Sequence, residues 1–267
     1  MEHRARKRFG QNFLVDDQVV EHIVAAVAPA AGQLILEIGP GQAALTNHLA
    51  RSGAELHLLE IDRDLAALLS RRFAGAENVE VHCGDALQLD LPALSSGRPF
   101  RLVGNLPYNI STPLIFHVLQ WHDLVVDMHF MLQQEVVERM AARPGGKAWG
   151  KLSVMCQYYC AVTPLFQVPP EAFRPVPKVQ STFVRLLPHA QPPAQVSDLA
   201  RFERLVTRAF SMRRKTLRNS LRGLLDAADI GAAGIDPGLR PEQLGLTEFA
   251  ALAERLGDTH DKDPGIS

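Results

Sequence analysis

The sequence has few cysteines, almost no net charge and no long apolar run. Its 267 residues include three cysteines, Cys83, Cys156 and Cys160, which are too few for a disulfide framework. We therefore expect reduced, buried thiols, as is usual in cytosolic proteins. No segment approaches an uninterrupted membrane span or has the charged start, apolar middle and small-residue end of a secretory signal. These absences favour a cytoplasmic protein without membrane contact.

The formal net charge is −1, so overall charge does not indicate a nucleic-acid partner. The charge is unevenly distributed, however, because the N-terminal arm is basic at Arg6, Lys7 and Arg8 and residues 201–222 are basic again. Local patches of this kind, rather than net charge, create the electrostatic footprint of a nucleic-acid surface. A solvated helix face is the alternative interpretation of the second stretch.

Short apolar runs alternate with helix-length segments through the first two-thirds of the chain. The apolar runs cover residues 34–38, 56–61, 79–82, 100–103, 125–132 and 182–187. Residues 64–73 and 112–119 have the length expected of connecting helices. Alternation of strands with helices is typical of an α/β fold, in which helices cover both faces of a parallel sheet.

The composition changes after Pro188. Residues 191–193, Gln-Pro-Pro, have the character of a linker. Beyond them, apolar residues recur at helical spacing over 202–210 and 217–225, and residues 241–256 form a last expected helix. We predict a larger domain over residues 1–190 and a small all-helical domain over residues 191–267, with a frayed tail after Gly257.

A glycine-rich turn follows the first predicted strand. Gly39 and Gly41 would let the backbone approach a ligand closely, and the following helix start offers free N–H groups. Glu60 lies 21 residues after Gly39 and can accept hydrogen bonds from ribose hydroxyls. Asp85 ends the third predicted strand, where it can accept from an adenine amine. The glycine pattern alone fits any dinucleotide enzyme.

Two details favour S-adenosylmethionine over a nicotinamide cofactor. The turn lacks the third glycine typical of a pyrophosphate site. Glu37, Glu60 and Asp85 would also repel a phosphate, whereas a sulfonium cofactor carries none. Any one of these carboxylates has an alternative role as a solvated loop residue, and a nicotinamide oxidoreductase remains a distant alternative.

Residues 104–111, Gly-Asn-Leu-Pro-Tyr-Asn-Ile-Ser, follow the fourth predicted strand. They combine an amide acceptor (Asn105), a rigid turn (Pro107) and an aromatic ring (Tyr108), which suits a pocket for one flipped adenine. The Asn105 oxygen and the Leu106 carbonyl can hold the amine hydrogens so that the nitrogen lone pair faces a methyl donor. Stacking on Tyr108 would contribute roughly 1–3 kcal/mol. An ordinary proline turn is the alternative.

The proline-rich stretch 173–181 offers two more candidates. Phe173 could cover the other face of the base, although a core position is the alternative, and Lys178 could contact phosphate. His117, His122 and His129 are neighbours in sequence, but no pair of them has a convincing spacing with a third ligand, so we expect no metal. We also expect a monomer, because no heptad seam or large apolar helix face stands out.

Taken in order, the motifs resemble those of the ribosomal RNA adenine dimethyltransferases, and most closely the bacterial enzymes that act on 16S RNA. The resemblance rests on residues 6–14, 37–41, 59–62, 84–86, 105–111, 131–136, 173–181 and 213–219. It implies a class I S-adenosylmethionine-dependent methyltransferase fold: a Rossmann-like, mixed, mostly parallel seven-stranded sheet with a small helical C-terminal domain. Catalysis would then belong to residues 1–190 and RNA binding to residues 191–267.

The same resemblance implies a reaction. The protein would dimethylate the N6 amines of two adjacent adenosines near the 3′ end of 16S rRNA, within the immature small ribosomal subunit. Four S-adenosylmethionine molecules would be consumed and released as S-adenosylhomocysteine. Methylation of 23S rRNA or DNA is one alternative. A ribosome assembly factor that acts mainly by binding is another.

The resemblance also assigns residues, including Asn12 and Leu14, which composition alone would not select. The expected cofactor site is Asn12, Leu14, Gly39, Gly41, Glu60, Asp85 and Asn105. The expected adenine site is Asn105, Leu106, Pro107, Tyr108 and Phe173. The expected RNA contacts are Arg6, Lys7, Arg8, Lys178, Arg213, Arg214, Lys215 and Arg218. Gln42 and Ala43 depart from the Leu-Gly that the family often has there, and they leave both turn glycines in place.

Overall fold

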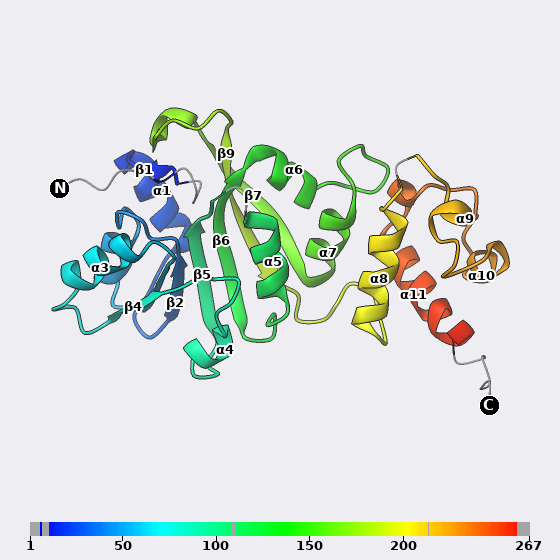
Figure 1. Ribbon diagram of the computed structural model, residues 1–267, viewed down its shortest axis with the longest axis horizontal. Helices are drawn as coiled ribbons and strands as arrows, with labels where there is room; N and C mark the ends of the chain where they lie inside the picture. The colour runs from blue at the N-terminus through cyan, green and yellow to red at the C-terminus, as the bar shows by residue number, and fades with distance from the viewer. Residues whose placement is uncertain (1–5, 7–10, 108–109, 213, 261–267) are drawn as a thin grey trace. The chain divides into compact units, whose positions relative to one another are not determined.

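A computed structural model describes residues 6, 11–107, 110–212 and 214–260 (Figure 1). Backbone contacts divide the chain into two units. The first comprises Met1–Val137 and Ala161–Pro188, and the second Glu138–Cys160 and His189–Ser267. Residues 138–160 thus group with the C-terminal helices. The assignment of catalysis to residues 1–190 and of RNA binding to residues 191–267 stays a prediction.

The first unit is built on a seven-stranded sheet (Figure 1). Its strands are β2 (Leu34–Ile38), β3 (Glu55–Glu60), β4 (Val79–Cys83), β5 (Phe100–Asn105), β6 (Val125–Gln133), β7 (Cys160–Val168) and β9 (Ser181–Pro188). The strand order is β4-β3-β2-β5-β6-β9-β7. The strands from β4 to β6 pair in parallel, and β9 runs antiparallel to β6. The expected mixed, mostly parallel sheet is confirmed.

Helices connect and cover the strands of this sheet. They are α1 (Asp17–Val27), α2 (Thr46–Arg51), α3 (Arg63–Arg72), α4 (Leu91–Leu94), α5 (Ser111–Leu119) and α6 (Gln134–Met140). The side chains of Asp16 and Asp62 cap α1 and α3 by accepting hydrogen bonds from backbone N–H groups of the first turn. These caps satisfy donors that have no partner within the helix.

The strands alternate their side chains between two faces of the sheet. On β3, Leu56 and Leu58 point into a core that also contains Ile23 of α1 and Leu69 of α3. Glu55, His57 and Leu59 therefore point to the opposite face of the sheet. The hydrophobic core thus fixes which polar side chains of β3 share a face.

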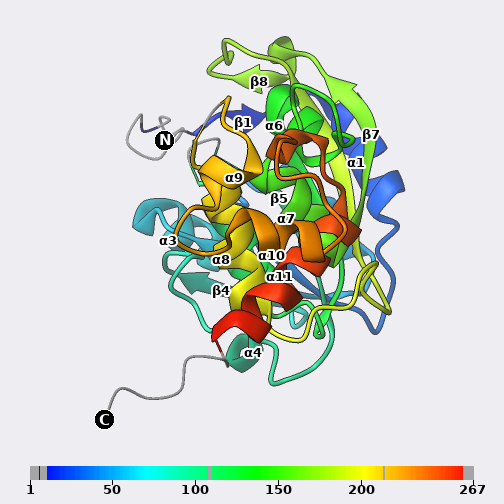
Figure 2. The same cartoon turned by 90° about the vertical axis from the view of Figure 1, so that its right-hand side faces the viewer.

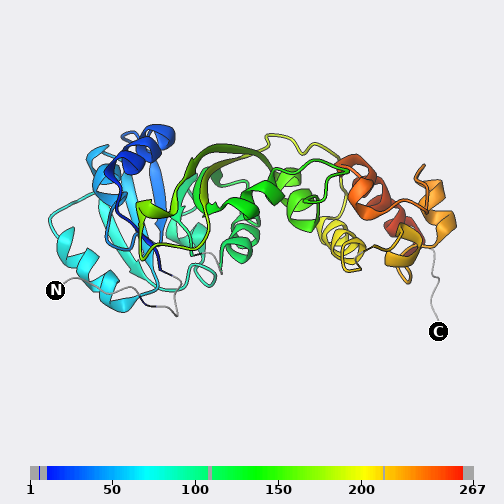
Figure 3. The same ribbon diagram turned by 90° about the horizontal axis from the view of Figure 1, so that it is seen from above.

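A two-stranded sheet joins the N-terminal segment to the loop before β9 (Figure 3). Strand β1 (Phe13–Leu14) pairs antiparallel with β8 (Phe173–Arg174), so Leu14 lies opposite Phe173. The Val15 N–H also donates to the Ala172 carbonyl, 2.9 Å away in the short helix η2 (Pro170–Ala172). This pairing holds the segment around Phe13 and Leu14 against the rest of the first unit.

The second unit is helical apart from its connections (Figure 2). Its elements are α7 (Lys151–Tyr159), α8 (Leu199–Ala209), α9 (Leu217–Ser220), α10 (Ala227–Ala232), η3 (Pro241–Gln243) and α11 (Leu246–His260). Phe202 of α8 packs on the ring of Tyr158 at 4.8 Å between centroids, and Phe249 of α11 is fully buried. The Trp149 indole donates to the Leu244 carbonyl at 2.9 Å. The expected helical C-terminal region is confirmed.

Some local expectations were wrong. Cys156 and Cys160 are buried as expected, but Cys83 is exposed. The last helix starts at Leu246 rather than at residue 241 and continues past Gly257. Within the described part of the chain, no helix is long and apolar enough to cross a membrane.

Candidate cofactor and adenine site

A pocket opens in the first unit where the parallel strands β2, β3, β4 and β5 end. This edge is where open α/β sheets bind ligands. Every predicted cofactor residue lines it: Asn12, Leu14, Gly39, Gly41, Glu60, Asp85 and Asn105. Leu106 and Pro107 of the predicted adenine site line it too. The structure therefore brings these residues together, and their contacts with ligand stay predictions.

The glycine turn after β2 requires its glycines. Gly39 has a φ of 68° and Gly41 a φ of 55°, in the left-handed region that favours glycine. A Cβ added at Gly41 would lie 3.0 Å from the Phe13 ring, so the N-terminal segment closes directly over the turn. Ala43 adopts a φ of 69° without being glycine, which places its strain at the point where the sequence departs from the family pattern.

Glu60 organises the turn from the end of β3. Its carboxylate accepts hydrogen bonds from the Gly41 N–H at 3.1 Å and from the Asp62 N–H at 3.0 Å. Burial raises the pKa of Glu60, and these two donors partly offset that effect. The side chain thus links β3 to the glycine turn through contacts within the protein alone.

Glu37, on β2, is a buried carboxylate that lines the pocket. Burial raises its pKa to about 7; the neighbouring Thr46 side chain opposes this shift, and the nearby Glu60 charge adds to it. Among the described residues, Glu37 Oε2 and Thr46 Oγ1 are buried without a hydrogen-bond partner. An unpaired buried acceptor is costly, so this region fits a ligand that brings positive charge or hydrogen-bond donors. S-adenosylmethionine brings both.

The Asn105 amide is oriented by the N-terminal segment. Its Nδ2 donates to the Asn12 carbonyl at 2.9 Å, which leaves Oδ1 as the atom able to accept from an amine. The preceding Gly104 allows the close approach of β5 to β2, because a Cβ there would lie 2.6 Å from the Ile38 carbonyl oxygen. After Asn105, the Pro107 carbonyl accepts from the Ile110 N–H at 3.1 Å and so shapes the turn into α5.

Asp85 follows β4 and lines the same pocket, half-buried. Its Oδ1 accepts from the Leu87 N–H at 3.0 Å. Ile61 and Ala86, two apolar residues that were not predicted from the sequence, line the pocket next to Glu60 and Asp85. Ile61 is 43% exposed although it is large and apolar, a feature that only the folded structure reveals. Apolar surface beside acceptors suits an adenine ring.

Phe173 does not line the pocket in this structure. Its side chain is 1% exposed and belongs to the core cluster with Leu14, Val168 and Phe183. The core position weighed as its alternative is therefore the one observed. Its contact with a base stays a prediction that would require the side chain to leave the core.

The predicted RNA contacts differ in their surroundings. Arg6 forms ion pairs with Asp62, at 2.9 Å, and with Asp64, so its guanidinium already has partners within the first unit. Lys178, Arg214, Lys215 and Arg218 are exposed. Tyr108, Lys7, Arg8 and Arg213 lie outside the described residues. All RNA contacts stay predictions.

A seven-stranded mixed sheet with a glycine turn and acidic residues at successive strand ends defines a methyltransferase that uses S-adenosylmethionine. The family model described as ribosomal RNA adenine dimethylase matches residues 2–256. The chain belongs to this family.

Similarities to individual proteins and solved structures are consistent with this family. A ribosomal RNA small subunit methyltransferase A from Pseudomonas putida is 56% identical over 258 residues, covering 96% of this chain and 97% of that protein. The crystal structure of the 23S rRNA methyltransferase ErmE is 28% identical with a TM-score of 0.71, covering 92% of this chain and 100% of that one. The crystal structure of a dimethyladenosine transferase from Plasmodium falciparum has a TM-score of 0.80 at 24% identity, and the match covers 93% of this chain and 98% of that one. At this identity the likeness supports the fold alone.

Proposed function

We propose that the protein dimethylates the N6 amines of two adjacent adenosines near the 3′ end of 16S rRNA, using S-adenosylmethionine. The reaction would take place on the immature small subunit in the cytoplasm, with the protein acting as a monomer and without a metal in catalysis. Family membership and the likeness to a small subunit methyltransferase support this proposal. The structural observation that carries it is the Asn105 amide, oriented by Asn12 at the edge of a pocket lined by the buried Glu37, whose Oε2 has no hydrogen-bond partner.

When bound, S-adenosylmethionine supplies a methyl group on a good sulfonium leaving group. The contribution of the protein is therefore mainly positioning. Asn105 Oδ1 and the Leu106 carbonyl hold the amine hydrogens, so that the nitrogen lone pair faces the methyl group. Glu37 and Glu60 contribute negative charge around the cationic donor. No side chain is needed as a strong base, because the methylated nitrogen loses its proton readily to solvent.

Two successive methyl transfers to one amine limit how many hydrogens Asn105 Oδ1 and the Leu106 carbonyl can accept from it. The first transfer meets an amine with two hydrogens, the second meets one hydrogen, and the product has none. Asn105 and Leu106 therefore cannot both remain satisfied by the base through both steps. Asn105 is half-buried and Leu106 is buried, so the Asn105 side chain can turn toward solvent more easily than the Leu106 backbone can. We expect Asn105 to matter most in the first transfer.

The test uses immature small subunits, isotopically labelled S-adenosylmethionine and mass spectrometry of the RNA. We expect label at two adjacent dimethylated adenosines, with Asn105→Ala reducing the rate by about 100-fold. The exposed Asn219, outside the pocket, supplies the matched control Asn219→Ala, which should keep the rate. Label found in 23S rRNA or DNA alone would contradict the proposal.

A second role, in which the protein assists assembly by occupying immature subunits, is favoured by the exposed basic residues Arg214, Lys215 and Arg218. Cells that carry only the Asn105→Ala variant would separate the two roles. Normal subunit maturation without methylated adenosines would assign maturation to binding. A maturation defect equal to that of complete loss of the protein would assign it to methyl transfer.

A further inference from the structure

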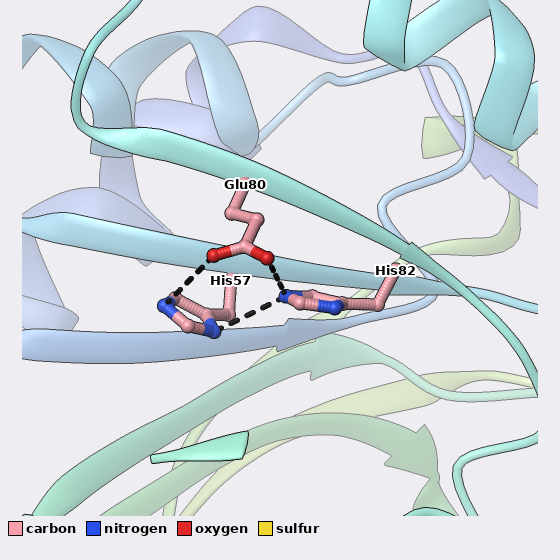
Figure 4. Close-up of side chains that lie close together, drawn as sticks. All are labelled: His57, Glu80 and His82. Atoms are coloured by element: carbon pink, nitrogen blue, oxygen red, sulfur yellow. Dashed lines mark hydrogen bonds and ion pairs between the residues drawn. The ribbon is translucent and has the colours of Figure 1, made fainter. Parts of the chain in front are cut away.

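Two histidines and a glutamate gather on the sheet face opposite the α1 core. His57 lies on β3, and Glu80 and His82 lie on the neighbouring strand β4. The parallel register places His57 beside Glu80 and Leu59 beside His82, so all three polar side chains emerge on one face. Figure 4 shows the Glu80 carboxylate facing both imidazole rings. None of the three lines the cofactor pocket.

The separations between these side chains match those of ligands around one small metal ion. His57 Nδ1 lies 3.2 Å from His82 Nε2, and His82 Nε2 lies 3.5 Å from Glu80 Oε1. Ligands held 2.0–2.1 Å from a tetrahedral zinc ion are about 3.3 Å from one another. One ligand atom from each of the three residues lies within 4.8 Å of the others.

The outer nitrogen of His57 has the partner that metal-bound histidines usually have. His57 Nε2 lies 3.3 Å from Glu55 Oε1 and 3.9 Å from Glu80 Oε2, and the Arg98 guanidinium donates to the Glu55 carboxylate at 2.6 and 2.8 Å. A carboxylate on the far nitrogen fixes the tautomer and leaves the near nitrogen able to bind a metal. Arg98 and Glu55 thus provide the support that orients His57.

We propose that His57, His82 and Glu80 form a binding site for a divalent transition-metal ion, with zinc as its best match. Imidazole nitrogens with one carboxylate suit zinc better than magnesium or calcium, which prefer oxygen ligands. Three protein ligands leave one tetrahedral position for water. The two rings now lie nearly parallel, at 24° and 5.0 Å, so ligation requires one of them to turn. His82, with 21% of its side chain exposed on the terminal strand of the sheet, has room to do so.

Sequence spacing could not reveal this site. His57 and Glu80 lie far apart in the chain and become neighbours only through the register of β3 and β4. The histidines considered from sequence, His117, His122 and His129, belong to no group of three candidate ligands among the described residues. The sequence led us to expect no metal, and the site proposed here, which lies outside the cofactor pocket, departs from that expectation.

The test measures zinc binding to untagged, chelator-treated protein by titration calorimetry. We expect one zinc ion per chain. His82→Ala should weaken binding at least 100-fold and the exposed Glu80→Gln about 10-fold, because each removes one ligand. Arg98→Ala, which keeps all three ligands, should weaken binding about 10-fold through the loss of support. Cobalt as a substitute should give the visible absorption of a four-coordinate ion in the wild-type protein.

The control is His122→Ala. His122 also contacts a carboxylate, Asp123 at 3.3 Å, but it belongs to no group of three candidate metal ligands among the described residues. This variant should bind zinc like the wild type. Glu80 and His82 are partly exposed, so their variants should fold, which circular dichroism can verify. Absence of zinc binding in the wild type, or equal affinity in the wild type, His82→Ala and Glu80→Gln, would overturn the proposal.

Discussion

Glu37 is a buried carboxylate whose charge depends on what fills the pocket. Its pKa of about 7 exceeds the usual value of 4.5 because burial disfavours the charged form. Folding without a ligand therefore favours the protonated form of Glu37. The stability from this preference is fully present below pH 4.5 and is lost as pH rises through about 7. A cationic ligand reverses this preference and favours the carboxylate.

We therefore predict that affinity for S-adenosylmethionine rises with pH from 6 to 7.5. The charged fraction of a group with pKa 7 grows several-fold over this range, so the dissociation constant should fall by a similar factor. Glu37→Gln should flatten this dependence, because the amide does not titrate. Calorimetric titrations of both proteins at matched pH values provide the measurement. Equal slopes for the two proteins would exclude Glu37 as the source.

Arg101 and Asp127 form a buried ion pair between β5 and β6. The guanidinium donates to both Asp127 oxygens at 2.8 and 3.0 Å and to the Val27 carbonyl at 2.7 Å, which ties these strands to the end of α1. Burial alone would raise the pKa of Asp127, but the neighbouring His129 and Arg101 outweigh it and hold this pKa well below its usual range. The stability from this group is therefore lost as pH falls below the usual aspartate range.

Asp127→Asn should lower the free energy of unfolding by about 3–5 kcal/mol, because it leaves the buried guanidinium without its counter-ion. The half-exposed pair of Lys151 and Glu203 offers a contrast. Lys151→Ala should change stability by less than about 1 kcal/mol. Urea denaturation of the three proteins measures both effects. A loss as small as that of Lys151→Ala would show that Arg101 finds other partners.

At the scale of elements, helix α1 ends in a conformation unsuited to its residue. Ala28, the C-cap, has a φ of 47° and is exposed, so its methyl group is strained without being buried. Ala28→Gly should stabilise the protein by about 1 kcal/mol. Ala25, exposed in the body of the same helix, supplies the matched control. Ala25→Gly should instead cost about 1 kcal/mol, and thermal unfolding of both variants would show opposite shifts.

Elements with strong apolar runs could be predicted from the sequence, and β2 begins and ends at the expected residues. Strand β7 was missed because only its two terminal residues, Cys160 and Val168, are fully buried, so no apolar run marks it. Its Pro164 argues against a central strand but is tolerated in β7, which lies at the end of the sheet.

The pocket lining was predictable where a motif lies at the end of a strand, as at Asn105 and Asp85. It was not predictable where tertiary contacts decide the role of a side chain. Phe173 pairs with β1 and enters the core, and Arg6 is engaged by Asp62 and Asp64. Neither contact leaves a periodic signal in the sequence, because each joins segments far apart in the chain.

At the scale of the whole molecule, the two units should separate cofactor binding from part of RNA binding. Lys215→Ala and Arg218→Ala remove exposed charges of the second unit and should weaken small-subunit RNA binding while leaving S-adenosylmethionine affinity unchanged. Each lost phosphate contact should reduce the slope of log affinity against log salt concentration by about 1, because about one fewer counterion is released on binding. Filter binding over a range of salt concentrations is the measurement. Arg240→Ala, which removes an exposed arginine that contacts Glu242, is the control.

The hydrogen bond from Asn105 to Asn12 has a consequence for turnover. Each methyl group uses one cofactor molecule, so complete modification under the proposed function requires the pocket to be emptied and refilled several times. The strand that begins with Phe13 covers the glycine turn, and the Asn12 carbonyl beside it aims the Asn105 amide. Movement of this segment to release spent cofactor would also disturb the amide that holds the base. Under the proposed function, cofactor exchange by such a movement would interrupt base alignment, and the residence time of the RNA relative to that exchange would determine whether one visit completes an adenosine.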